Sequence, residues 1–183
     1  TLDVVPPYSL RLTVHVLRRV STNIVDQWAG GIYSRAFQIG PDEYILHVRQ
    51  LDQTTLEVAA DRSPDAVLLL VRRMLGLDVD LAEALRLAAA DPWLGAIVPF
   101  VRGLRPPRFA SLFETLVMTI PFQQVSLEAG QSYVNRLVAR FGKSRGAVWL
   151  FPTPEMIADA SIEDLRAVGL SVAKAKTLQH AAS

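Results

Sequence analysis

The sequence contains no cysteine. Disulfide bonds, thiolate metal sites and a cysteine nucleophile are therefore excluded. A chain without thiols suits a reducing compartment, so we predict a cytoplasmic location.

Long hydrophobic runs are also missing. The longest run, residues 66–71, is far shorter than the roughly 20 residues that a bilayer-spanning helix needs. Residues 1–8 have neither the basic start nor the apolar stretch of a secretion signal. We predict a protein that does not contact a membrane.

Motifs for metals and nucleotide cofactors are absent too. The three histidines, His15, His47 and His180, lie far apart, and none has the close spacing of a zinc-binding pair. Gly30-Gly31 lacks the strand-to-helix context of a phosphate-binding loop. We predict no metal and no cofactor.

Charge is balanced overall but unevenly distributed. The net charge is +1, with 9 basic and 12 acidic residues in 1–101 and with 10 and 6 in 102–183. An anionic partner is therefore expected to bind the second part of the chain.

The first part of the chain predicts an α+β fold. Residues 2–5 read as a short strand, and Ser9 is placed to cap a helix that runs to about Val20. Three segments with strand character and short polar connections predict an antiparallel meander. They are residues 33–39, 43–49 and 54–60.

Helices are expected after the meander. Ser63-Pro64 predicts the start of one, Asp80 with Glu83 a capping box for a helix over 81–90, and Asp91-Pro92 a short helix that ends by Pro99. Residues 1–101 are therefore interpreted as a small antiparallel sheet domain with helices.

A proline-rich stretch, residues 102–108, predicts a linker. From Phe109 onward we expect only helices: 109–120 up to a break at Pro121, 126–141, and three more after Thr153-Pro154, Ser161 and Ser171. The final helix has an apolar stripe and few neighbours to cover it. Residues 109–183 are therefore predicted to be the first part of an incomplete all-α domain.

The joint Ile120-Pro121-Phe122-Gln123-Gln124-Val125-Ser126 is the segment with the clearest functional potential. A glutamine amide carries two donors and an acceptor, so it can satisfy either edge of an unpaired base. It is also flat and long enough to fill the gap that a nucleotide leaves in the stack.

The joint and several flanking motifs resemble a known family. They are similar to the 3-methyladenine DNA glycosylase II (alkylbase, AlkA-like) branch of the helix-hairpin-helix DNA glycosylases. The matching motifs are Pro6-Pro7-Tyr8, Gly103-Leu104-Arg105-Pro106-Pro107, Phe113-Glu114-Thr115-Leu116-Val117, Ile120-x-x-Gln123-Gln124-Val125-Ser126, Arg140-Phe141-Gly142, Phe151-Pro152-Thr153-Pro154-Glu155, Leu165-Arg166-Ala167-Val168-Gly169-Leu170 and Lys174-Ala175.

The resemblance implies base-excision repair of double-stranded DNA. A damaged base would be flipped out and its N-glycosidic bond hydrolysed, by a monomeric enzyme in the cytoplasm or on a prokaryotic nucleoid. Many members have Leu-Gly where this chain has Pro121-Phe122. The family's hairpin and catalytic aspartate are expected beyond Ser183, so these residues alone are predicted to be inactive, with no catalytic residue among them.

Position by position, the resemblance makes Gln124 the first candidate for the wedge and Gln123 a supporting contact. Phe122 is a candidate for the base pocket, and Arg105 and Arg108 for phosphate contacts. Lys174 and Lys176 are interpreted as solvated helix positions.

Two alternatives remain open from the sequence. One is a DNA-damage-binding module without catalysis. The other is an oxidised-purine glycosylase with lyase activity, which uses a lysine nucleophile; the paired glutamines favour the alkylbase branch.

Overall fold

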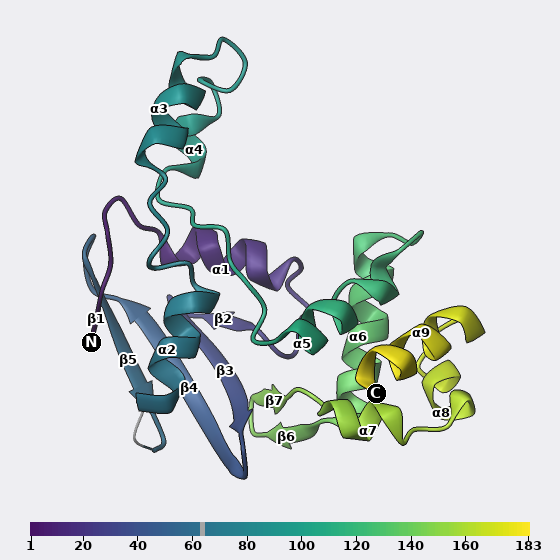
Figure 1. Ribbon diagram of the computed structural model, residues 1–183. Helices are drawn as coiled ribbons and strands as arrows, with labels where there is room; N and C mark the ends of the chain where they lie inside the picture. The colour runs from purple at the N-terminus through teal and green to yellow at the C-terminus, as the bar shows by residue number, and fades with distance from the viewer. Residues whose placement is uncertain (63–64) are drawn as a thin grey trace.

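The computed structural model describes residues 1–62 and 65–183, and it confirms the predicted α+β fold. A five-stranded sheet with helices forms one half of the molecule and a mainly helical part forms the other (Figure 1). In chain order the elements are β1 (Leu2–Asp3), α1 (Leu10–Arg18), β2 (Gln27–Ala29), β3 (Ile32–Ile39), β4 (Asp42–Gln50), β5 (Thr55–Ala60), α2 (Asp65–Met74), α3 (Ala82–Ala90), α4 (Val98–Val101), α5 (Leu112–Val117), the 3-10 helix η1 (Ile120–Phe122), α6 (Leu127–Phe141), β6 (Lys143–Arg145), β7 (Val148–Leu150), α7 (Pro154–Ala158), α8 (Ile162–Ala167) and α9 (Val172–Ala182).

The sheet is the predicted antiparallel meander with one strand added at each edge. Its strand order is β1-β5-β4-β3-β2, and every neighbouring pair is antiparallel. Gly40, at φ 59°, makes the turn between β3 and β4 in a conformation that glycine adopts without strain. Strand β2 was not expected, because three residues are too short to show an alternating pattern.

Helices α1 and α2 share one core with the sheet. Ser9 caps α1 as predicted, and Leu10, Val14 and Leu17 are buried. Helix α2 lies across the sheet in Figure 1 and adds Val67, Val71 and Met74 to the same cluster. The start predicted at Ser63-Pro64 lies outside the described residues.

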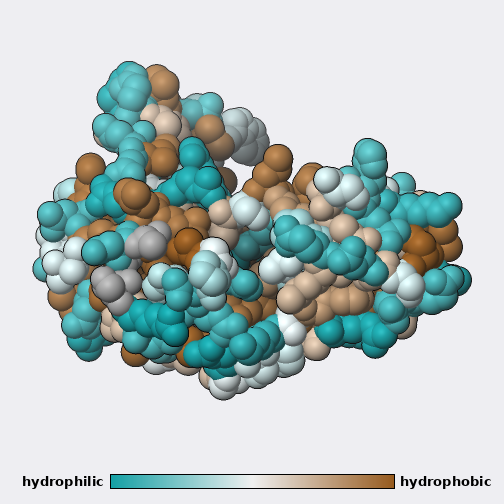
Figure 2. All heavy atoms as spheres, turned by 60° about the horizontal axis from the view of Figure 1, so that its bottom comes forward, coloured by the Kyte–Doolittle hydropathy of each residue, from teal (hydrophilic) through white to brown (hydrophobic). Residues whose placement is uncertain are grey.

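Helices α3 and α4 form a lobe that projects away from the sheet (Figure 1). Neither helix has a buried residue, and the Trp93 side chain is 85% exposed. The short helix predicted from Asp91-Pro92 is wrong: the Asp91 carboxylate accepts from the amides of Trp93 and Leu94, which makes a turn, and α4 begins only at Val98. On this lobe, Figure 2 shows hydrophobic residues at the surface beside hydrophilic ones.

The capping box predicted for α3 is incomplete. Asp80 accepts from the Ala82 amide at 2.8 Å, but Glu83 reaches Arg86 instead of turning back to the helix start.

The second half contains the predicted helices and one unpredicted hairpin. Residues 104–109 are non-helical. The helix expected over 109–120 is shorter, α5 followed by η1, because Pro121 interrupts the α-helical bonding. The expectation of helices alone is wrong at β6 and β7, which pair as a two-stranded hairpin.

The helical half has its own core and also packs on the sheet. Buried Val117, Leu137, Ile157 and Leu178 lie in the core of the helices. A smaller cluster joins Ala36 of β3 to the β7 hairpin strand. Among the described residues, no helix has both the length and the apolar character to cross a membrane.

Candidate nucleic-acid interface

The joint between α5 and α6 is a tight, well-defined turn. Helix η1 ends at Phe122, Gln123 is extended with φ −62° and ψ 129°, and Gln124 is left-handed with φ 58°. Ser126 then begins α6 by accepting from the Ala129 amide at 3.2 Å. The break predicted at Pro121 is therefore confirmed.

Gln123 and Gln124 both have exposed side chains. In the part of the chain that the structure describes, neither amide side chain makes a hydrogen bond. A left-handed conformation costs a non-glycine residue roughly 1–2 kcal/mol. Strain of this kind persists only where the surroundings enforce it, and it is common at functional sites.

The Lys174 side chain contacts the backbone of this joint. Its ammonium donates to the carbonyl oxygens of Pro121, at 3.0 Å, and Gln123, at 2.7 Å. It lies on α9, whose start is capped by Ser171. The interpretation of Lys174 as a solvated helix position is therefore wrong. The sequence carried no signal for this contact, because its partners are backbone atoms 51 and 53 residues away.

Phe122 is half-buried beneath the joint. Its ring packs against Gly130 of α6, where an added Cβ would lie 2.6 Å from the Cγ atom of the ring. On the other side the Arg19 guanidinium lies 4.4 Å from the ring centre and donates to the Met118 carbonyl. Burial lowers the pKa of Arg19. These contacts explain the position of the Phe122 ring by packing within the protein. They give no support to its predicted role in a base pocket.

Of the two predicted phosphate contacts, one is buried. Arg105 is 2% exposed, and its guanidinium donates to the Val5 carbonyl at 3.0 Å. We therefore assign Arg105 a structural role in holding the linker to the sheet half. Arg108 has an exposed side chain, while its backbone amide is fixed to the Met74 carbonyl at 2.9 Å.

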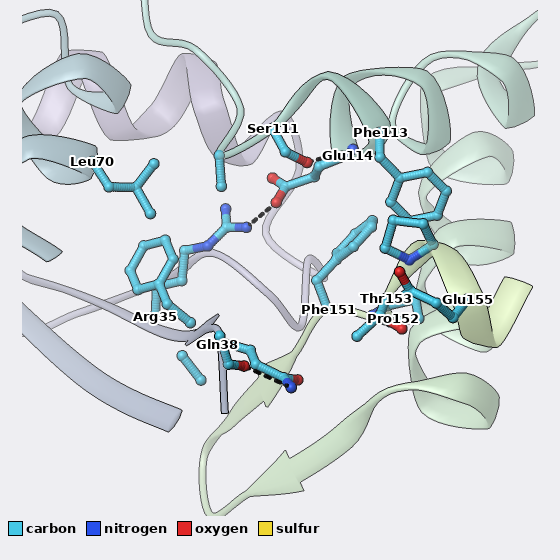
Figure 3. A pocket seen from close by; sticks show the side chains of 15 residues that line it. Arg35, Gln38, Leu70, Ser111, Phe113, Glu114, Phe151, Pro152, Thr153 and Glu155 are labelled. Carbon is cyan, nitrogen blue, oxygen red and sulfur yellow. Dashed lines mark hydrogen bonds and ion pairs between the residues drawn. The ribbon is translucent and has the colours of Figure 1, made fainter. Parts of the chain in front are cut away.

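A cavity of about 440 Å³ lies between the two halves. Figure 3 shows Phe113, Phe151 and Pro152 on one side of it and the Arg35–Glu114 ion pair on the other.

Arg35 is the centre of a buried ion-pair cluster in the wall of this cavity. It binds Asp26 at 2.8 Å and Glu114 at 2.5 Å, and all three side chains are almost fully buried. Burial alone would lower the pKa of Arg35, but the two carboxylates raise it well above its ordinary value. Burial raises the pKa of Glu114 against the opposing effect of Arg35. Because both carboxylates are bound to Arg35, the cluster joins the halves and offers no free acid or base.

No grouping of three or more potential metal ligands occurs among residues 1–62 and 65–183.

Comparisons with known proteins decide the family. A model of the AlkA N-terminal domain matches residues 1–111. A model of the HhH-GPD superfamily of base excision DNA repair proteins matches residues 117–183. The chain belongs to the AlkA-like HhH-GPD superfamily.

The relatives of this AlkA-like chain include proteins of bacteria and archaea. The transcriptional activator/DNA repair enzyme AlkA of Mycobacterium tuberculosis is 37% identical over 93 residues, which are 48% of this chain and 19% of that protein. The DNA-3-methyladenine glycosylase of Bacillus subtilis is 24% identical over 181 residues, which are 92% of this chain and 60% of that protein.

Solved structures share the fold. The 3-methyladenine DNA-glycosylase from Archaeoglobus fulgidus has a TM-score of 0.84 at 24% identity, and the match covers 100% of this chain and 66% of that one. The AlkA-like chain thus spans between about a fifth and two thirds of these relatives.

Proposed function

We propose that the protein containing this chain is a base-excision glycosylase for alkylated purines. In this proposal it flips the damaged base out of double-stranded DNA and hydrolyses the N-glycosidic bond without lyase chemistry. One observation carries it: within a family of base-excision proteins, the chain presents an exposed glutamine in a strained, enforced turn.

Gln124 is the proposed wedge. Extruding a nucleotide costs a few kcal/mol of stacking and pairing, and less for a damaged base. An amide side chain that enters the vacated space stacks on the neighbouring bases and donates to the orphaned one. Gln123 lies next to Gln124 and is the proposed supporting contact.

The DNA itself is the proposed partner of the face around the joint. Arg108 is a proposed phosphate contact, because its guanidinium is exposed. The second part of the chain has the surplus of positive charge that DNA binding favours. We also propose that the protein acts as a monomer, in the cytoplasm and on the nucleoid if the source is a prokaryote.

The substrate class rests on the names of the relatives. The Bacillus subtilis and Archaeoglobus fulgidus proteins are named as 3-methyladenine glycosylases. The two buried carboxylates of the described residues, Asp26 and Glu114, both bind Arg35. We therefore assign no catalytic residue, and we propose that these 183 residues by themselves bind damaged DNA and release no base.

Fluorescence anisotropy with two duplexes tests the wedge. One duplex carries an abasic-site analogue and the other is intact. We expect tighter binding of the chain to the abasic duplex, weakening with salt as phosphate contacts require. Gln124→Ala should lose this preference, whereas Gln53→Ala, at an exposed loop glutamine of the sheet half, should keep it. An unchanged preference in Gln124→Ala would remove the wedge.

Incubation of the chain with methylated DNA and with 8-oxoguanine DNA tests whether these residues release a base and whether they have lyase activity. No free base is expected from either. Release of 3-methyladenine would contradict the missing catalytic group, and strand cleavage at 8-oxoguanine would favour the lyase alternative.

A further inference from the structure

Helix α9 reaches across to the joint through a single cation. The Lys174 ammonium donates to two carbonyl oxygens, at 3.0 Å to Pro121 and 2.7 Å to Gln123, and lies 5.9 Å from the centre of the Tyr133 ring. The other lysine of α9, Lys176, is exposed and makes no hydrogen bond in the described part of the chain. The two lysines of one helix therefore have different environments.

Lys174 binds the carbonyl of Pro121, in the last turn of η1, and the carbonyl of Gln123, the residue that follows this helix. The last carbonyls of a helical turn have no partner within the helix and carry partial negative charge. An ammonium group has three donors, so it can satisfy two such oxygens at once. Bonding both carbonyls fixes the peptide unit between Pro121 and Phe122 and the one between Gln123 and Gln124.

Gln124 follows directly and holds φ 58°, a conformation that an unrestrained glutamine would leave. The residue after it, Val125, leads into the cap at Ser126, so the downstream side is fixed by α6. On the upstream side the backbone is fixed by the Lys174 contacts. Removing the ammonium would release the upstream side only.

Resting on the proposed wedge role of Gln124, we propose that Lys174 is a positioning residue that holds the wedge in its insertion-ready conformation. Ordering a loop during binding weakens binding, and ordering it beforehand avoids that cost. Lys174 acts through the backbone of Pro121 and Gln123 and does not itself touch the DNA. This distinguishes it from an ordinary phosphate-binding lysine on the same face.

The experiment compares Lys174→Met, Lys174→Arg, Lys176→Met and Gln124→Ala in the full chain. Amide hydrogen exchange at residues 123–125 is measured without DNA. We expect faster exchange in Lys174→Met, partial rescue in Lys174→Arg, which keeps a cation able to donate, and no change in Lys176→Met. Equal melting temperatures for the wild type and Lys174→Met would show that the effect is local.

Binding to the abasic and intact duplexes at several salt concentrations gives the second readout. Lys174→Met is expected to weaken abasic-duplex binding by roughly three- to tenfold, to leave intact-duplex binding unchanged, and to keep the salt slope. A lysine that bound phosphate would instead weaken both duplexes equally and reduce the slope by about one.

The outcomes separate the two proposals. If Gln124→Ala keeps the abasic preference, the wedge itself fails. If Gln124→Ala loses the preference and Lys174→Met keeps it, or if Lys174→Met weakens both duplexes with a smaller slope, the positioning role is overturned while the wedge stands. Unchanged amide exchange in Lys174→Met also overturns the positioning role.

Discussion

Gln124 combines a side chain available to a ligand with a backbone conformation that is unfavourable for glutamine. Its φ of 58° is a conformation that glycine adopts freely, although glycine loses more backbone entropy on folding. We therefore predict that Gln124→Gly keeps or raises the free energy of unfolding, by up to about 1 kcal/mol, and abolishes the abasic preference. Urea denaturation measures the first effect. Gln124→Ala is the control, since alanine retains the strain; greater stability in Gln124→Ala than in Gln124→Gly would contradict the argument.

Arg35 is a buried cation that forms ion pairs with two buried carboxylates. Arg35→Met would leave Asp26 and Glu114 buried without a counter-charge, and we expect a loss of about 3–5 kcal/mol in unfolding free energy. Arg49→Met is the matched control, because its ion pair with Glu57 is exposed and such pairs contribute less than about 1 kcal/mol. Similar losses in both variants by urea denaturation would mean that the buried cluster adds nothing beyond a surface pair.

Single residues differ in how far the sequence predicts them. The paired glutamines were found because they occupy adjacent positions at a helix break, which is a local pattern. Arg35 and Glu114 are 79 residues apart and were missed, because a charged residue in a strand looks solvated until its partner is known. Arg105 was misinterpreted for the same reason, since an arginine next to prolines reads as exposed and the side chain of this one is buried.

At the scale of elements, α6 depends on a glycine where helices normally prefer alanine. An exposed alanine is about 1 kcal/mol better than glycine in a helix interior. At Gly130, however, an added Cβ would lie 2.6 Å from the Cγ atom of the Phe122 ring. We predict that Gly130→Ala destabilises by about 1–3 kcal/mol through overpacking and also reduces the abasic preference, because displacing Phe122 displaces the joint.

Ala139→Gly, at an exposed position of the same helix, is the control that measures the effect of helix propensity without overpacking. It should lose about 1 kcal/mol in unfolding free energy and keep its DNA binding. A stabilised Gly130→Ala variant would show that the ring moves without cost.

Helix starts were the most predictable part of the fold. Ser9, Ser126, Ser161 and Ser171 all accept a hydrogen bond from a first-turn amide, as their sequence positions predicted. The β6–β7 hairpin was missed because three-residue strands carry too little periodicity. The exposed lobe around Trp93 was also unpredictable, because its apolar residues read as core.

On the scale of the whole molecule, the sheet half and the helical half are joined at several separate places. The Arg35 cluster links β3 to α5, and the Arg19 side chain reaches from the end of α1 to Phe122. The joint between α5 and α6 is thereby tied to the sheet half as well as to α9. The predicted division into two domains at residues 102–108 remains a prediction. The two links are contacts between the parts on either side of it.

A further link between the halves, an ion pair at the surface, gives the molecule a pH dependence. Glu43 of β4 binds Lys143 of β6 at 2.7 Å and also Arg145. The hydrogen bond from Lys143, followed by the charge of Lys143 and the contacts from Arg145, lowers the pKa of Glu43 below its ordinary 4.5. A carboxyl whose pKa is lower in the folded state stabilises above its unfolded pKa, and this stabilisation is lost as pH falls through the folded pKa.

We therefore predict that the free energy of unfolding of Glu43→Gln differs from that of the wild type at neutral pH and converges with it as the pH falls below 4.5. Urea denaturation across this pH range measures the difference. Glu163→Gln, at an exposed acidic residue of α8 for which the described residues show no ion pair, should follow the wild type throughout. A difference between Glu43→Gln and the wild type that stays constant with pH would mean that the link acts through side-chain packing, and a difference that grows on acidification would contradict the lowered pKa.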